Sequence, residues 1–396
     1  MRTALPLKES FISMVSKFFH HQEAMKNLRN GRGQPITTHV MATDICNHKC
    51  AFCSVQARAG DTLPLKDILA YLDILLRFGL KSVILSGGGN PILYKCPEEG
   101  YDFNVLVDEI HSRDLEIGVI TNGMPMKGYE EDTWNDVLPP IMRRSWKTVR
   151  PETLDKLTWI RISMSGLDHP ENAVYVPDVD PEKTTLGFSY VLHDIYTEPA
   201  DPHHGQVSRP EDFLTLGTER LHDHRIKPPR YGADRIPVLT DQIGEIVRKH
   251  HPKYVRLLPN CLQPAMIPER CDLLQKMADA IDPDVVFVQY KPPAAPNACY
   301  LGYIHPVLNC DGFVYPCDSC VLNEEAGHQF GESWRVCHWS KVASIYEQPV
   351  RSLIGDPKKQ CPGCVFHGSN LLLEGVVNGT ADITPPVEVP SHPNFV

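Results

Sequence analysis

Three cysteines within eight residues constrain this chain more than any other feature of its sequence. The segment CNHKCAFC spaces Cys46, Cys50 and Cys53 as C-x3-C-x2-C. Thiolates are soft ligands that favour iron–sulfur clusters, zinc or Cu(I). Three thiolates on one short loop can bind three irons of a cubane cluster, and the open position on the fourth iron can then accept a substrate or cofactor. The triad therefore predicts a 4Fe–4S cluster with one exchangeable iron.

Two other interpretations of the triad stay open at this point. Zinc could bind the three cysteines together with His48, although C-x3-C-x2-C is not one of the usual zinc spacings. The thiols could also be buried without binding any metal. The segments that follow the triad bear on this choice.

The composition is that of an ordinary soluble globular protein. The chain has 396 residues, of which 42% are hydrophobic and 22% are charged. Its formal charge of −10 argues against a nucleic-acid-binding protein, because phosphate contacts require a basic face. No apolar run is long enough to span a membrane, and the N-terminus lacks the apolar region of a signal peptide. We therefore expect a cytoplasmic protein, in which cysteines serve as metal ligands more readily than as disulfides.

Strands and amphipathic helices alternate along most of the chain. This alternation predicts βαβ units and a parallel sheet, in which functional residues gather at the carboxyl ends of the strands. Helices are predicted at about 8–29, 65–78, 102–114 and 240–250. Strands are predicted at about 36–46, 81–86, 115–123, 158–164, 187–194 and 253–260.

Small or polar residues stand at the ends of the second, third and fourth predicted strands. The segment SGGGNP follows the second strand, and glycine allows backbone groups to approach a ligand closely. Taken alone, a triple glycine is only a turn, and a serine at a strand end could simply cap one. The candidates for ligand contacts at these ends are Gly87, Gly88, Gly89, Asn90, Thr121, Asn122, Ser163 and Ser165.

The triad and these strand ends, in this order, resemble the radical S-adenosylmethionine (SAM) superfamily. Phe52, just before the last cysteine, fits the same signature, and SGGGNP resembles the segment that holds the SAM amino group, with Asn90 where glutamate is common. The resemblance implies cofactor-binding roles for Phe52 and for the strand-end residues above. It also implies that a 4Fe–4S cluster binds SAM, and that an external flavodoxin- or ferredoxin-type donor supplies one electron. The 5′-deoxyadenosyl radical released from SAM then abstracts hydrogen from a substrate.

A second cysteine-rich region follows the proline-rich linker KPPAAPN at 291–297. The dipeptide Asp311–Gly312 predicts a hairpin that would bring Cys299 close to Cys317. The cysteine spacing resembles the Twitch/SPASM extension of radical SAM enzymes, most of all that of dehydrogenases acting on 2-deoxy-scyllo-inosamine. The resemblance implies one auxiliary 4Fe–4S cluster, held by Cys299, Cys317, Cys361 and Cys364.

Other groupings of these cysteines remain open. Cys317 and Cys320 with Cys361 and Cys364 would also make a zinc-ribbon-like pair. A further cluster could involve Cys310, Cys320 and Cys337, although no fourth ligand is evident. Ordinary core or surface thiols are expected at Cys96, Cys261 and Cys271.

These observations predict an α/β fold: an open six-stranded parallel (β/α)6 partial barrel with a smaller C-terminal cysteine-rich auxiliary-cluster domain. The predicted parts are a helical segment at 1–35, the barrel at 36–290, the auxiliary domain at 291–370 and an extended tail at 371–396. Within the barrel, a Pro-, Asp- and His-rich insertion at about 167–236 reads as a substrate-specificity loop. His203 and His204 lie in this insertion and are expected to be solvated.

The expected function follows from the auxiliary cluster. A cluster ligated entirely by protein cannot bind substrate, so the resemblance implies electron transfer and favours net oxidation of a polar small molecule. A peptide-modifying radical SAM enzyme and a non-enzymatic metal-binding protein remain as alternatives. The sequence identifies no catalytic acid or base. Arg256, at the sixth strand, is the candidate for positioning a substrate or binding an anion, with a structural ion pair as the alternative role.

Overall fold

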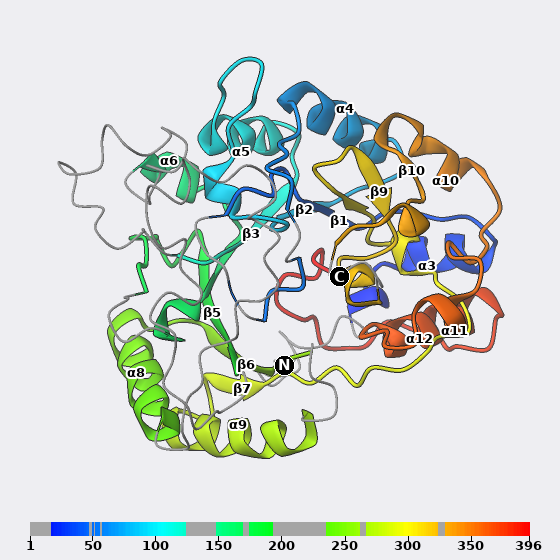
Figure 1. Cartoon of the computed structure of the whole chain (residues 1–396). Helices are drawn as coiled ribbons and strands as arrows, with labels where there is room; N and C mark the ends of the chain where they lie inside the picture. The colour runs from blue at the N-terminus through cyan, green and yellow to red at the C-terminus, as the bar shows by residue number, and fades with distance from the viewer. Residues whose placement is uncertain are drawn as a thin grey trace.

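The computed structural model describes residues 17–46, 50, 52–55, 58–123, 148–168, 174–192, 235–261, 267–323 and 329–396. One ten-stranded sheet organises these residues, with the strand order β10-β9-β8-β1-β2-β3-β4-β5-β6-β7. Figure 1 shows this sheet curving around the centre of the molecule, with α4, α5, α8 and α9 on its outside. The fold is therefore mixed α/β with a mostly parallel sheet.

Strands β1 to β7 are parallel, and each pairs with the next strand in the chain. The six predicted strands are present, but the count of six was wrong, because a seventh parallel strand pairs with β6. Its three residues are too short to give a periodic pattern. The strands are β1 Thr37–Val40, β2 Ser82–Leu85, β3 Glu116–Thr121, β4 Trp159–Ser163, β5 Thr185–Leu192, β6 Tyr254–Pro259 and β7 Val286–Val288.

The connecting helices bury apolar faces against the outer side of the sheet. In α4, Ile68, Leu72 and Leu75 are buried at helical spacing, as the sequence predicts, and Gly79 ends the connection with a φ of +100°. The helices of this part are α3 Gln22–Arg29, α4 Leu65–Leu76, α5 Phe103–His111, α6 Pro151–Leu154, α8 Arg235–His250 and α9 Ile267–Ile281. Among the described residues, no helix is long and apolar enough to cross a membrane.

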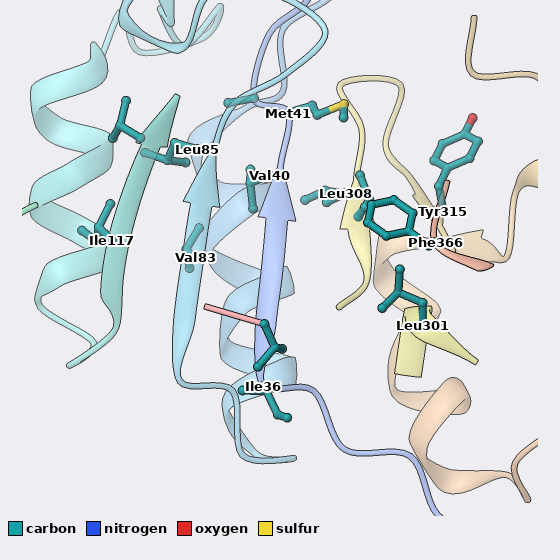
Figure 2. Close-up of a cluster of buried hydrophobic side chains, with 14 of the residues drawn as sticks. Ile36, Val40, Met41, Val83, Leu85, Ile117, Leu301, Leu308, Tyr315 and Phe366 are labelled. Atoms are coloured by element: carbon teal, nitrogen blue, oxygen red, sulfur yellow. The ribbon is translucent and has the colours of Figure 1, made fainter. Parts of the chain in front are cut away.

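The two faces of the parallel sheet differ in chemistry. Residues such as Val40, Val83 and Leu85 are fully buried on the outer face, where they form part of the core shown in Figure 2. The alternate residues point to the inner side and include polar and charged side chains. Arg161 pairs with Gly187, and Ser189 pairs with Arg256, and paired residues lie on the same face of the sheet. We call this inner side the lumen. The outer face holds the fold together, and the lumen face is available for function.

The C-terminal cysteine-rich region continues the same sheet. Strand β8 (Val307–Leu308) pairs with β1 in parallel and with β9 (Phe313–Tyr315) in an antiparallel hairpin, and β10 (Cys337–His338) pairs with β9. The hairpin predicted at Asp311–Gly312 is therefore present. Figure 2 shows Leu301, Tyr315 and Phe366 in one core with the β1 side chains. The remaining helices are α10 Ala343–Glu347, α11 Pro357–Gln360 and α12 His367–Val377.

Aromatic rings fill the amino-terminal end of the lumen. Trp159 lies beside Gly118 of β3, and Tyr254 lies beside Gly187 of β5. A Cβ atom added at Gly118 would be 2.1 Å from the Trp159 ring, and one at Gly187 would be 2.3 Å from the Tyr254 ring. Both glycines are therefore required sterically, because each leaves room for a neighbouring ring to lie across its strand.

The last described residues pack against this aromatic layer at the first residues of the strands. Helix α12 runs past residue 370, so the stretch without regular structure begins at 378, and its last residues are buried. The Phe395 ring meets the Trp159 ring edge-on at 5.2 Å, and Val396 N donates to Thr37 Oγ1 at 3.0 Å. Asn394 O accepts from Ser82 Oγ at 2.6 Å. We call residues 392–396 the floor segment, because they contact the first residues of β1, β2 and β4.

Candidate functional site

The cysteine triad lies where β1 ends, and its three thiols are close to one another. Burial and then the neighbouring thiols of Cys53 and Cys46 raise the pKa of Cys50 well above its ordinary value. Arg58 Nη2 donates to Cys53 Sγ at 3.1 Å. Burial alone would lower the pKa of Arg58, but the three thiols outweigh it and raise that pKa. The Arg58 guanidinium thus favours negative charge on the triad sulfur atoms, whereas burial and the crowding of the thiols favour the neutral thiol at Cys50.

Two of the predicted strand-end residues contact the triad directly. Asn122, after β3, donates from Nδ2 to Cys46 Sγ at 3.6 Å. The hydroxyl of Ser165, after β4, is hydrogen-bonded to the thiol of Cys50 and lowers its pKa, against the larger effect of burial. Donors around sulfur are the environment in which iron–sulfur clusters are held and tuned. The residues present therefore fit a thiolate-bound cluster at this position.

A buried hydrogen-bond chain fixes Asn122. Thr121 Oγ1 donates to Asn90 Oδ1 at 2.8 Å, and Asn90 Nδ2 donates to Asn122 Oδ1 at 2.9 Å. All three residues are less than a tenth exposed. The chain thus connects the glycine segment after β2 to the end of β3 and then to Cys46. In this geometry the Asn90 side chain braces the site through Thr121 and Asn122.

The glycine segment packs against the backbone that leads into the cysteine loop. Gly89 N donates to Thr43 O at 3.0 Å, and Asn90 N donates to Ile45 O at 2.8 Å. A Cβ atom at Gly89 would lie 2.0 Å from Ile45 O, and one at Gly88 would lie 3.0 Å from Asp44 Cβ. The absence of side chains therefore has a structural reason that the sequence could not show. The predicted SAM contacts of Gly87, Gly88 and Gly89 remain predictions.

Five cysteines of the C-terminal region lie near one another, namely the four predicted ligands and Cys320. Burial, followed by the thiols of Cys317, Cys361 and Cys364, raises the pKa of Cys299 well above its ordinary value. Burial and then the thiol of Cys317 raise the pKa of Cys364 to about 11. Cys320 is also close, because Cys317 and Cys361 both raise its pKa after burial. Which four of these five thiols would bind a cluster remains a prediction.

Asn370 on α12 joins the two halves of this group, and the sequence reasoning missed it. Its Oδ1 accepts from Tyr300 N at 2.8 Å and from Leu301 N at 3.1 Å, and its Nδ2 approaches Cys364 Sγ at 3.9 Å. The residue is 2% exposed. A buried asparagine six residues after CPGC could have drawn attention, because buried polar side chains require partners.

The other cysteines lie apart from both groups or at their edges. The acids that raise the pKa of Cys310, after burial, are Asp44, Asp61 and Asp311, so Cys310 faces the triad side. Burial raises the pKa of Cys337 to about 11, with Lys341 opposing it. Cys96 is buried beside Leu65, whose amide donates to its sulfur at 3.4 Å. These placements do not gather Cys310, Cys320 and Cys337 into a third group.

Single-ion sites were the main alternative for both groups. Within the described ranges, no three or more His, Cys, Asp or Glu side chains lie close enough together to hold one metal ion. A cubane cluster separates its cysteines further, because each thiolate binds a different iron. His48, the proposed fourth zinc ligand, lies outside the described residues, as do His203 and His204. Phe52 is half-buried next to Cys53.

The predicted positioning residue Arg256 projects into the lumen. Its guanidinium carbon lies 5.3 Å from the centroid of the Tyr254 ring, and Nη1 donates to Gln289 Oε1 at 3.2 Å. Burial and then the charge of Arg161 lower the pKa of Arg256 to about 9. Arg161 itself was not singled out from the sequence, where one arginine in a strand carries no signal of its orientation.

Solved structures with a limited likeness to this chain bind SAM. SuiB from Streptococcus suis bound to S-adenosylmethionine is 14% identical, with 75% of this chain and 63% of that chain covered and a TM-score of 0.41. Native anSMEcpe with bound AdoMet and Cp18Cys peptide is 13% identical, with 83% and 82% covered and a TM-score of 0.41. BtrN in complex with AdoMet and 2-DOIA is 10% identical, with 89% and 93% covered and a TM-score of 0.33. This chain spans less than two thirds of the SuiB structure, and TM-scores this low do not transfer a substrate or a reaction.

The family comparison gives a firmer assignment. No curated protein matches the chain. Residues 40–137 match the family model described as the Radical SAM superfamily, and this range contains the triad, the glycine segment and Asn122. Residues 40–137 of this chain thus match the radical SAM superfamily, whose enzymes use a 4Fe–4S cluster and S-adenosylmethionine.

Proposed function

We propose that this protein is a radical SAM enzyme that catalyses a net oxidation of a polar small molecule inside the lumen, with an auxiliary 4Fe–4S cluster as the electron acceptor. The observation that carries the proposal is the second gathering of thiols around Cys299 in the same molecule as the triad. Such an oxidation removes one hydrogen atom, one proton and one electron from the substrate. The electron requires an acceptor, and a second thiol-bound cluster has suitable chemistry.

The triad side of the site would hold the first cluster and SAM. Cys46, Cys50 and Cys53 would be the iron ligands, and Asn122, Ser165 and Arg58 would donate to their sulfur atoms. When bound, the cluster and SAM supply a 5′-deoxyadenosyl radical that takes one hydrogen atom from the substrate. Phe52, Gly87, Gly88, Gly89, Asn90, Thr121 and Ser163 are proposed to shape the SAM pocket.

The C-terminal side would hold the auxiliary cluster. Cys299, Cys317, Cys361 and Cys364 are its proposed ligands, and Asn370 fixes the distance between the first and last of them. Since these ligands leave no iron open, this cluster would exchange electrons only. The finer architecture, a partial barrel followed by an auxiliary-cluster domain at 291–370, belongs to the same proposal.

Two sets of cysteine variants test the assignment. Anaerobically reconstituted protein with Cys46, Cys50 and Cys53 all changed to Ala should lose 5′-deoxyadenosine formation but retain about half of its iron, as expected when one of two equal clusters is removed. Cys271→Ala is the control, because this half-buried α9 thiol belongs to neither group. Unchanged 5′-deoxyadenosine formation in the triple variant would refute the triad's role.

The auxiliary ligands need their own comparison. Cys299→Ala should lose auxiliary iron, whereas Cys320→Ala should keep it, and iron counting with electron paramagnetic resonance measures both. Substrate oxidation should fall more than SAM cleavage in Cys299→Ala if the cluster accepts the electron. Zinc in anaerobically purified protein, or iron loss in Cys320→Ala alone, would contradict the proposed ligand set.

A further inference from the structure

Three positively charged side chains meet in the lumen between the aromatic layer and the triad. Arg161 on β4 pairs with Gly187 of β5, and Arg256 on β6 pairs with Ser189 of the same strand. Paired residues lie on the same face of a sheet, so both arginines project into the lumen from either side of β5. Gly187 has no side chain, and the Tyr254 ring lies across it. Lys291 follows β7 and is near enough for both arginines to lower its pKa.

Aromatic rings contact Arg161 and Lys291 but do not neutralise their charge. The guanidinium carbon of Arg161 is 5.9 Å from the centroid of the Trp159 ring, and the Lys291 ammonium is 4.2 Å from that of the Phe366 ring. A cation–π contact orients a cation and stabilises it modestly, and the positive charge remains. The arrangement therefore holds positive charge at a fixed place inside a chain whose formal charge is −10.

The acids near these groups are few. Burial is the largest cause that lowers the pKa of Lys291, Asp318 opposes it, and Arg256 and Arg161 lower it further. Asp318 also lies 3.9 Å from His39 Nδ1, but burial lowers the pKa of His39 to about 4, so this ring is neutral and the carboxylate offsets part of the Lys291 charge. At the floor, Glu116 faces Lys17, and after burial each shifts the pKa of the other. In the part of the chain that the structure describes, neither Arg161 nor Lys291 forms an ion pair with a carboxylate.

One hydrogen-bond donor in the same region lacks an acceptor. Arg161 Nε is shielded from solvent and has no hydrogen-bond partner among the described residues. Buried donors are nearly always satisfied, and leaving one unsatisfied costs about 1–3 kcal/mol. On the outer face, by contrast, the neighbours Ile160 and Ile162 are completely buried. An unsatisfied Arg161 donor, and two cations, Arg161 and Lys291, with one nearby carboxylate, Asp318, favour an acceptor with negative charge at this place.

We propose that the substrate carries a carboxylate or phosphate group, which binds in the lumen between Arg161, Arg256 and Lys291. This inference rests on the proposed function and narrows it, because a cationic amino sugar would add a fourth positive charge to the same space. Guanidinium groups suit this task, since their planar donors match the oxygens of carboxylate and phosphate. The substrate class is therefore an acidic small molecule.

Calorimetric titration of the reconstituted enzyme, saturated with SAM, tests the proposal. Inorganic phosphate and malonate serve as probes of the two anion types. Arg161→Gln should weaken binding of at least one probe by roughly tenfold or more, as expected for loss of a charged hydrogen bond. The matched control is Arg113→Gln, because Arg113 pairs with Asp73 and Glu109 away from the lumen. Arg161→Lys, which keeps the charge, should retain part of the affinity.

Separate readouts distinguish the possible failures. SAM affinity should be the same in Arg161→Gln and in the parent. Loss of SAM binding with unchanged probe binding would mean that Arg161 binds the SAM carboxylate. That result would overturn the proposal. Probes that bind neither protein, or bind Arg161→Gln and Arg113→Gln equally, also overturn it. If 5′-deoxyadenosine still forms in that case, the proposed function stands and only the substrate class is wrong. Lys291→Met provides a second variant if Arg161→Gln does not fold.

Discussion

Replacing Phe395 with alanine should release the floor segment from the base of the lumen. The Phe395 side chain is 7% exposed, and its ring packs edge-on against Trp159 at 5.2 Å. Truncating a buried phenylalanine to alanine costs about 3–5 kcal/mol, and an aromatic pair contributes part of this. We expect the lower end, about 3 kcal/mol, because a segment at the edge of the core can relax after truncation. That free energy corresponds to an increase of about 100-fold in the opening equilibrium of the segment.

Hydrogen exchange measures this opening directly. The amide of Val396 donates to Thr37 Oγ1 at 3.0 Å, so its exchange rate reports detachment of the floor segment. The rate should rise about 100-fold in Phe395→Ala and stay unchanged in the control Val387→Ala, whose side chain is 81% exposed in the same stretch. Equal exchange in the two variants would show that the aromatic contact does not hold the segment in place.

Three further predictions concern single positions. Gly89→Ala should prevent iron from binding at the triad while the auxiliary iron remains, because the new Cβ atom would lie 2.0 Å from Ile45 O. A normal iron content in this variant would refute the prediction. Gly118→Ala should lower the free energy of unfolding by about 1–3 kcal/mol through overpacking against Trp159, measured by urea denaturation against the open position Gly355→Ala. Burial lowers the pKa of Lys17 to about 7, against about 10.4 in an unfolded chain, so the unfolded chain binds more protons between these values. The free energy of unfolding of the parent should therefore increase relative to that of Lys17→Met as the pH rises from about 7 to about 10. A difference between the two proteins that does not change with pH would exclude a buried neutral amine at Lys17.

Local sequence patterns sufficed for the outer half of the fold. The spacing of Ile68, Leu72 and Leu75 specified a helix, and short β-branched runs specified the parallel strands, because one face of each element is buried in an apolar core. The order of triad, glycine segment and strand-end residues also predicted that these residues lie together after the carboxyl ends of the strands, and Asn122 and Ser165 do contact the triad thiols. The residues themselves could not show that Asn90 braces Asn122, since that contact depends on the approach of two separate strand ends.

Nonlocal packing explains what the sequence could not provide. The stretch after residue 378 has no periodicity, and nothing local indicates that Phe395 returns to Trp159. Strand β7 was missed because three residues give too short a pattern. Arg161 and Lys291 look like ordinary charged residues until strand register brings them to one side of the sheet. In each case the informative partner lies far away in the sequence.

The layers of the lumen connect the floor segment to the proposed anion site. Phe395 supports Trp159, and Trp159 in turn seats Arg161, so a loosened floor should also loosen the guanidinium that we propose binds substrate. The triad lies at the opposite ends of the same strands and contacts the floor through none of the described hydrogen bonds. Phe395→Ala should therefore weaken phosphate or malonate binding less than Arg161→Gln does, while SAM affinity stays that of the parent. Loss of SAM affinity in Phe395→Ala would show instead that the floor segment supports the whole sheet, and that the layers do not act separately.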